Sequence, residues 1–168
     1  KVPVARFDAD AASNPGERER LLAGFAKGQA PILVGTQLLV HQPGVPKAGL
    51  VGILRPEYLL GFSDYRAAQK TFEAVSAMLG FVRDAADAEA VIQTAGPAHF
   101  AVAAAAAGDY EAFYGREIEF RRVLGYPPFA ALAEVVLQGR DVRALGAKSR
   151  ELRALLQKAG PGIEVLGP

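Results

Sequence analysis

The sequence predicts an α/β protein with a parallel sheet, followed by a partial α+β domain. Residues 31–35, 49–54 and 90–94 are short, continuous apolar runs, a pattern typical of strands that are buried on both faces. Helical patterns separate such runs along the chain, and this alternation favours parallel strands with right-handed crossovers. The alternation changes after residue 108, where an alanine-rich segment ends.

The N-terminal segment predicts a strand followed by a capped helix. Residues 2–7 have a β-type pattern with a polar exit. Ser13 or Asn14 is placed to cap the helix, Pro15 suits its first turn, and Gly28 ends it. The expected apolar face of this helix consists of Leu21, Leu22 and Phe25.

Two further helices are predicted before residue 108. Residues 64–83 repeat apolar side chains on one side of a helix, and residues 97–107 form an alanine-rich helix that Gly108 stops. His99 lies near the start of the second of these helices, where we expect a surface or capping role. The repeating side chains of the first helix are Ala67, Ala68, Phe72, Val75 and Leu79.

A third helix ends at a proline corner. Asp109 is suited to cap a helix that extends to Leu124, and Gly125 is suited to the position just after its end. Pro127 and Pro128 prevent the helix from continuing.

The C-terminal part predicts a strand at 132–137, an amphipathic helix at 142–158 and the start of another strand at 163–166. A βαβ piece that stops on its second strand is incomplete. We therefore expect two domains, 1–108 and 109–168, with the second one truncated. The expected buried side of the amphipathic helix consists of Val142, Leu145, Leu152, Leu155 and Leu156.

Composition excludes several classes of site. The 168-residue chain is 51% hydrophobic, enough for one good core or two small ones, and its net charge of +1 gives no global attraction to nucleic acid. With no cysteine, and only His41 and His99 as imidazoles, we expect no metal site. No apolar run is long enough to span a bilayer, and no signal peptide precedes the first strand. Because the chain begins at Lys1, in a strand-type segment, we expect a fragment of a longer cytoplasmic protein.

Several separate motifs resemble one family in the correct order and spacing, from about residue 4 to residue 167. They are the Gly35-Thr-Gln37 strand end, the strand at 50–54, the tract Phe62-Ser-Asp-Tyr-Arg-Ala-Ala-Gln-Lys-Thr-Phe72, the strand Val91-Ile-Gln-Thr94, the helix start Asp109-Tyr-Glu-Ala-Phe-Tyr114, and the string Arg116-Glu-Ile-Glu-Phe-Arg-Arg-Val-Leu-Gly-Tyr-Pro-Pro-Phe129. On these motifs the chain resembles the bacterial replication-restart helicases of the primosomal protein N′ (PriA) family.

The resemblance implies that 1–108 is a degenerate RecA-like second helicase lobe. It implies that 109–168 is the N-terminal part of the C-terminal domain, which in the family has a fold like that of a small-subunit ribosomal protein. The partners that it implies are forked and single-stranded DNA, single-stranded DNA-binding protein and primosome components, with no membrane, in the cytoplasm at the nucleoid. It implies no cofactor in this fragment, because the family's ATP-binding motifs and zinc segment lie upstream.

The chain departs from the family at the positions that serve ATP hydrolysis. Gly44 stands at a position that is acidic in the family. The two arginines of the family's Gln-Val-Ala-Gly-Arg-Ala-Gly-Arg signature fall on Phe81 and Asp84 of this chain. Arginine fingers are worth roughly 10³–10⁵ in phosphoryl-transfer rate. Arg83 is one residue from the second position, which on a helix points about 100° away. We therefore expect no catalytic residue here and no ATPase activity. An active ATP-dependent 3′–5′ DNA helicase with a non-standard finger, and a protein-binding adaptor, remain alternatives.

Two groups of residues are candidates for DNA contacts. Thr36 and Gln37 follow a predicted strand, where parallel sheets bind ligands, although a hydroxyl there also satisfies a turn. Arg143, Arg150 and Arg153 fall opposite the leucines of the 142–158 helix, a pattern that suits either a phosphate backbone or a solubilising face.

Two other charged pairs have structural interpretations that we favour. Arg121 and Arg122 suit phosphate contacts beside Tyr126, but they equally suit i, i+4 pairing with acidic residues and packing at the domain junction. Asp8 and Asp10 resemble a carboxylate pair, for which a solvated strand exit is the simpler interpretation.

Overall fold

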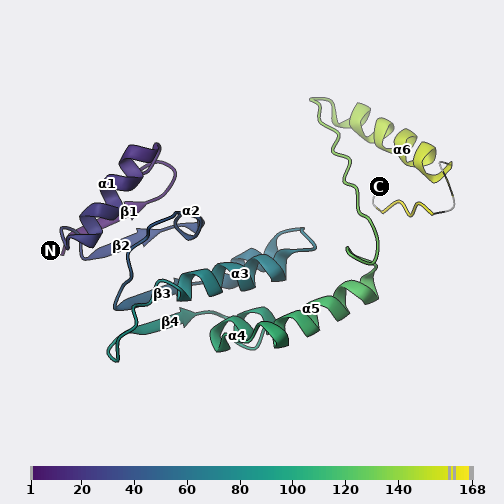
Figure 1. Cartoon of the computed structure of the whole chain (residues 1–168). Helices are drawn as coiled ribbons and strands as arrows, with labels where there is room; N and C mark the ends of the chain where they lie inside the picture. The colour runs from purple at the N-terminus through teal and green to yellow at the C-terminus, as the bar shows by residue number, and fades with distance from the viewer. Residues whose placement is uncertain (1, 159, 161, 167–168) are drawn as a thin grey trace. The chain divides into compact units, whose positions relative to one another are not determined.

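A computed structural model describes residues 2–158, 160 and 162–166 (Figure 1). The chain divides into two compact units, residues 1–129 and residues 130–168, each of which is described by itself. The first unit contains β1 (Val4–Phe7), α1 (Pro15–Ala26), β2 (Ile32–Gly35), α2 (Gln37–Val40), β3 (Leu50–Leu54), the 3-10 helix η1 (Pro56–Gly61), α3 (Ala67–Leu79), β4 (Glu89–Gln93), α4 (Phe100–Ala107) and α5 (Tyr110–Leu124).

The predicted parallel pairing is confirmed, but the strands form two separate sheets. β1 pairs with β2, and β3 pairs with β4. The predicted cap of α1 is also confirmed, since the Asn14 side chain accepts a hydrogen bond from the Glu17 amide at 3.0 Å, and Pro15 begins the helix. A small apolar cluster of Phe7, Ala12 and Leu22 joins β1 to α1.

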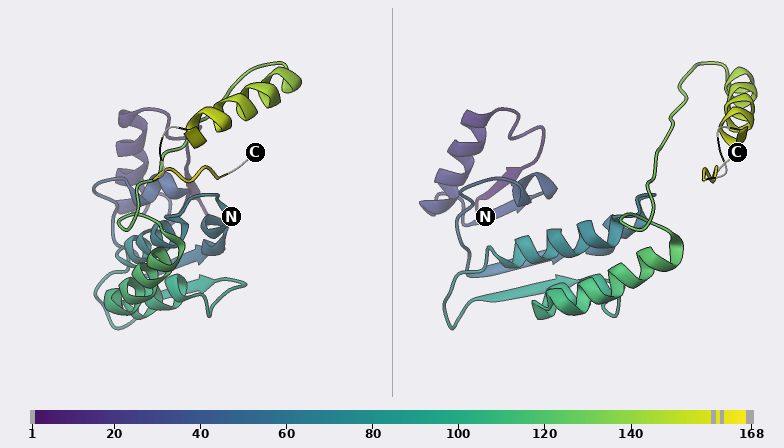
Figure 2. Two further views of the ribbon diagram at one scale, coloured as in Figure 1. Left: turned by 90° about the vertical axis from the view of Figure 1, so that its right-hand side faces the viewer. Right: turned by 45° about the vertical axis from the view of Figure 1, so that its right-hand side comes forward.

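Helices α3, α4 and α5 form a larger core against one face of the β3–β4 sheet. Figures 1 and 2 both show α3 alongside α5. The rings of Phe72 on α3 and Phe113 on α5 stack with centroids 4.2 Å apart. Val75 is fully buried, which confirms the predicted apolar side of α3. The buried members of this core are Ile53, Phe72, Val75, Ala101, Ala104, Ala105 and Phe113.

The opposite face of each sheet is open in this chain, so the expected burial of the strands on both faces is wrong. Side chains alternate along a strand, and every second residue of these strands faces solvent. The reason is that helices cover only one face of each two-stranded sheet. The fold is α/β with parallel pairing, whereas a RecA-like lobe stays a prediction. The exposed apolar residues of the strands are Val4, Ile32, Val34, Leu50, Leu54 and Val91.

The helix predicted over 64–83 is shorter at both ends. Asp64 precedes it, and its carboxylate accepts a hydrogen bond from the Arg66 amide at 2.9 Å. The Lys70 ammonium, 2.6 Å away, lowers the pKa of Asp64 well below its usual value. The helix ends at Leu79 followed by Gly80, so residues 81–84 lie beyond it.

Helix α5 packs in the first unit, and its predicted ends are confirmed. The Asp109 side chain accepts a hydrogen bond from the Ala112 amide at 2.9 Å, and Gly125 ends the helix at φ 63°. His99 similarly caps α4, because its Nδ1 accepts a hydrogen bond from the Ala101 amide at 3.3 Å. The compact units divide after Phe129, and the assignment of a lobe to 1–108 and a C-terminal domain to 109–168 stays a prediction.

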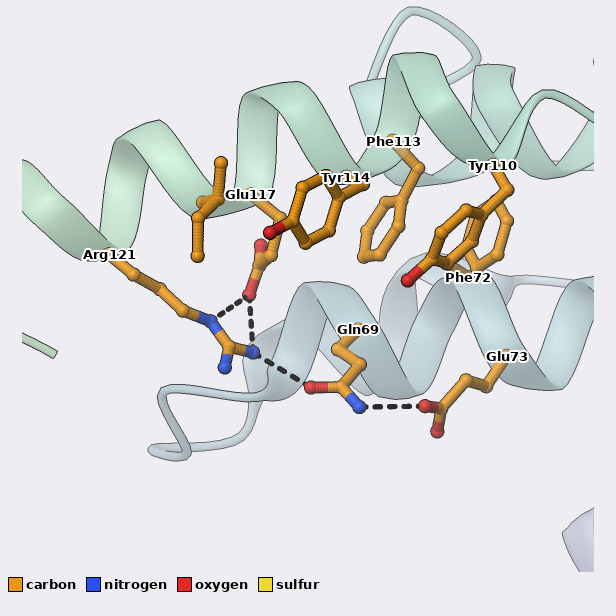
Figure 3. Close-up of a pocket in the computed structure, with 9 residues that line it drawn as sticks. Gln69, Phe72, Glu73, Tyr110, Phe113, Tyr114, Glu117 and Arg121 are labelled. Carbon is orange, nitrogen blue, oxygen red and sulfur yellow. Dashed lines mark hydrogen bonds and ion pairs between the residues drawn. The ribbon is translucent and has the colours of Figure 1, made fainter. Parts of the chain in front are cut away.

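Arg121 forms a buried ion pair within α5 and reaches α3 (Figure 3), and it also bonds to the proline corner. The Arg121 guanidinium lies 2.7 Å from the Glu117 carboxylate, with the two side chains 13% and 7% exposed. It also donates hydrogen bonds to Gln69 at 2.8 Å and to the Pro127 carbonyl at 3.3 Å, and it lies over the Tyr65 ring. The predicted pairing of Arg121 at i, i+4 is confirmed, and its partners all lie within the first unit.

In the second unit, α6 (Val142–Lys158) is amphipathic as predicted, but the burial of its apolar side is wrong. None of its described residues is buried, and Val142 is 81% exposed. Among the described residues, 132–137 and 163–166 form no strands, contrary to prediction. A strand must pair its backbone groups with a neighbouring strand, and this unit offers these segments none.

We expect Arg121→Ala to destabilise the protein by about 3–5 kcal/mol, because it leaves the Glu117 carboxylate buried without its counter-charge. Chemical denaturation of the variant and the wild type measures this difference. Arg116→Ala is the matched control: it removes the same charge from an exposed position of the same helix. Equal destabilisation of both variants would contradict a specific role for the buried pair.

Candidate functional site: the strand-end loops and the basic helix

Thr36 and Gln37 lie immediately after β2 and are exposed. The Thr36 amide donates a hydrogen bond to the Phe7 carbonyl at 3.2 Å, and its hydroxyl accepts one from the Leu38 amide at 3.4 Å. The hydroxyl therefore satisfies the turn, in keeping with the structural interpretation of this residue. A contact with the DNA backbone stays a prediction.

Gly35 fixes where these two residues lie. A Cβ atom at this position would be 2.8 Å from Cδ2 and 3.0 Å from Cβ of Leu39 on α2. Both distances are shorter than ordinary van der Waals contact, so the close approach of β2 and α2 requires a glycine. Leu39 also packs against the Phe7 cluster, which limits how far it can move.

The loop at 81–84, which the resemblance aligns with the arginine signature, is not helical. Phe81 is half-buried, and Asp84 is exposed. Val82 forms a parallel bridge with Ala48, where the Ala48 amide donates to the Phe81 carbonyl at 2.8 Å and the Arg83 amide donates to the Ala48 carbonyl at 3.0 Å. The expectation that Arg83 points about 100° away along a helix is therefore wrong, because α3 ends before it.

Arg83 is engaged on the surface of this loop. Its guanidinium lies 2.5 Å from the Asp87 carboxylate, and its side chain is 47% exposed. Surface pairs of this kind are worth about 0–1 kcal/mol, so the pair does not hold the arginine rigidly. Asp84 places a carboxylate beside it in sequence, at the position of the second signature arginine.

Gly44 lies in an exposed loop at φ 74°, which favours glycine. The structure brings this loop to the 81–84 loop: the Lys47 ammonium donates a hydrogen bond to the Gly80 carbonyl. Val45 of the same loop packs beside Leu39 against the Phe7 cluster. The loop before β3 and the loop after α3 are therefore neighbours. The loop of Gly44 also lines an open groove of about 650 Å³ along α1.

On α6, the three candidate arginines are not equivalent. Arg143 and Arg150 are exposed, whereas Arg153 is half-buried. Asp141 caps the helix through the Arg143 amide at 2.9 Å, and Lys148 pairs with Glu151 at 2.7 Å. The guanidinium groups of the two exposed arginines lie on the helix surface, where a phosphate backbone can reach them.

Of the two remaining carboxylate candidates, Asp8 has structural partners. Asp8 accepts a hydrogen bond from the Ala11 amide at 2.9 Å and pairs with Arg6 at 2.5 Å. These two interactions lower the pKa of Asp8. No group of three or more histidine, aspartate and glutamate side chains that could hold a metal occurs in the described part of the chain. Within that part, no helix is both long and apolar enough to cross a bilayer.

One feature of the strand ends was missed from the sequence. The 3-10 helix η1 follows β3 after Arg55, and Tyr58 on η1 and Phe62 just after it are both exposed. Arg55 and Tyr58 follow a predicted parallel strand, and parallel sheets bind ligands at the edge where their strands end. This position in the sequence was the signal that could have identified the feature.

No family model matches the chain. Along nearly its whole length it is similar to proteins named replication restart protein PriA: 34% identical over 167 residues to that of Bacillus subtilis, 32% over 165 to that of Synechocystis, and 33% over 165 to that of Thermotoga maritima. These alignments cover 98%, 97% and 98% of the chain but only 21%, 20% and 22% of the relatives. The chain thus spans about a fifth of the length of the curated relatives that it matches.

The resemblance drawn from the motifs is confirmed: the chain is a fragment of a PriA-like protein.

We expect Gly35→Ala to lower the free energy of unfolding by about 1–3 kcal/mol, the usual range for overpacking, because the new methyl group meets Leu39. Gly52→Ala is the matched control, since a Cβ at this strand glycine meets nothing within 4 Å. Chemical denaturation measures both, and Leu39→Ala should cost less stability in the Gly35→Ala background than in the wild type, because part of the steric contact is then removed. Equal effects of the two glycine substitutions would contradict the steric account.

Proposed function

We propose that the chain belongs to a replication-restart protein that binds forked and single-stranded DNA without ATP-driven motor activity. The names of its relatives support the restart role, since each is called replication restart protein PriA. As the chain spans about a fifth of those relatives, the activity of the whole protein is part of the proposal.

The observation behind the absence of motor activity is the chemistry of the 81–84 loop. Phe81 is half-buried and has no charge with which to stabilise a departing phosphate. Asp84 adds an anion where negative charge develops in phosphoryl transfer, which opposes the reaction. The backbone bridge to Ala48 fixes the loop in this arrangement.

DNA binding is proposed to use two parts of the chain. Thr36 and Gln37 contact the DNA backbone from the end of β2, and Arg143, Arg150 and Arg153 add non-specific affinity from α6. Single-stranded DNA-binding protein and primosome components are the proposed protein partners, in the cytoplasm at the nucleoid. ATP and zinc, where the whole protein holds them, are proposed to bind outside this segment.

The full-length protein should show no ATP hydrolysis above background in the presence of forked DNA, because the signature arginines are replaced. A steady-state ATPase assay with and without a fork substrate measures this. The matched control is the Bacillus subtilis relative under the same conditions. Clear DNA-stimulated turnover would contradict the scaffold and favour a motor with a non-standard finger.

Binding of the full-length protein to forked DNA should weaken steeply as salt rises. The slope of the logarithm of the binding constant against the logarithm of the salt concentration is the salt slope. In the triple variant Arg143→Ala, Arg150→Ala, Arg153→Ala, its magnitude should fall by about 1 for each phosphate that the variant no longer binds. Fluorescence anisotropy at several salt concentrations measures the slope. Absent or salt-independent binding by the wild type would favour the protein-binding adaptor. The charge-matched control combines substitutions at exposed positions of the first unit: Arg20→Ala, Lys27→Ala and Arg116→Ala.

A further inference from the structure

The carboxyl edge of the β3–β4 sheet has an aromatic surface that none of the candidate sites uses. Because the two strands are parallel, both end at this edge, where η1 follows β3 and Thr94 follows β4. Tyr58 and Phe62 are 67% and 53% exposed, although rings of this size are usually at least half covered. Their centroids are 5.4 Å apart with an interplanar angle of 86°, so each ring supports the other and both keep an outer surface.

This surface is held in place by buried and hydrogen-bonded neighbours. Pro56 is buried at the start of η1. The Glu57 carboxylate accepts a hydrogen bond from the Thr94 hydroxyl at 2.7 Å and another from the Ala95 amide at 3.3 Å, which ties η1 to the end of β4. The hydroxyl contact is the main cause of the lowered pKa of Glu57. Anchored rings lose little conformational entropy when they bind a ligand.

Arg55 adds a cation to the same surface. Its side chain is 78% exposed, and it approaches Glu57 only at 4.0 Å, because that carboxylate already accepts two hydrogen bonds. Its backbone has φ 53°, the left-handed region that residues other than glycine rarely adopt. Such conformations concentrate at ligand-binding segments, where the surrounding structure enforces them.

We propose that Tyr58 and Phe62 stack on the bases of single-stranded DNA while Arg55 contacts its phosphates. This proposal rests on the proposed DNA-binding function and names a site for it. Exposed rings beside an exposed cation match the two parts of a single-stranded nucleic acid, the π-face of the base and the phosphate. Duplex DNA keeps its bases stacked inside and offers these rings no partner.

The test measures the affinity of the full-length protein for two oligonucleotides of equal length by fluorescence anisotropy. One is oligo-dT, and the other is abasic, with the same phosphates and no bases. The wild type should bind oligo-dT more tightly than the abasic strand. The double variant Tyr58→Ala, Phe62→Ala should bind oligo-dT more weakly by about 5- to 150-fold for each base–aromatic stack that is lost, and it should bind the abasic strand almost as the wild type does.

Two further variants separate stacking from structure. Tyr58→Phe keeps the ring and should bind as the wild type does. Tyr114→Ala removes an exposed tyrosine of α5, outside this surface, and should leave both affinities unchanged. The salt slope should stay constant in the double variant, because both substituted side chains are uncharged.

The outcomes distinguish this site from the proposed function. A wild type that binds neither strand would refute DNA binding itself. A wild type that binds DNA, but with equal affinity for both strands or with an affinity that the double variant retains, would overturn the stacking site alone. Equal weakening for both strands in the double variant would overturn it too, since stacking cannot act on an abasic strand.

Discussion

The buried Arg121–Glu117 pair is the constraint on which the arrangement of the first unit depends. A charge that is only 13% exposed is tolerated when its partners satisfy it, and Arg121 has a carboxylate, an amide oxygen, a backbone carbonyl and an aromatic face as partners. These partners come from α5, α3, the segment before α3 and the proline corner. Helix α5 therefore cannot leave α3 without breaking the contacts of Arg121 with Gln69 and Tyr65 and separating the stacked rings of Phe72 and Phe113.

The loop at 81–84 of the same unit carries the proposal that the chain lacks motor activity. Where the family places arginines by resemblance, this chain has a half-buried ring at Phe81 and a carboxylate at Asp84. The loop between them is fixed, because Val82 bridges to Ala48 and Lys47 donates to the Gly80 carbonyl. This fixed loop, with an anion at its end, supports the proposal that the chain does not hydrolyse ATP, and the exposed groups after β2 and β3 support the proposed binding role.

Much of the local structure followed from residues that act on their nearest neighbours. Asn14, His99 and Asp109 cap the helices expected of them, and Gly108 and Gly125 end helices in the left-handed conformation. The relation to PriA also followed from linear motifs, because their order and spacing are properties of the chain itself. The exposed pair Tyr58 and Phe62 did not follow, since an aromatic residue in a sequence is usually a core residue and only coordinates show that these rings are exposed.

The sequence by itself determined the caps of α1, α4 and α5, the positions of the four strands and the relation to PriA, because capping, periodicity and motif spacing depend on neighbours within a few residues. Only the tertiary structure decided that these strands pair as two separate sheets with one open face each, that residues 132–137 and 163–166 form no strand, and that 81–84 lies beyond α3. The physical reason is that strand pairing and burial require partners distant in sequence. An apolar run indicates that a segment is stabilised by a neighbour, but not whether the folded chain provides one.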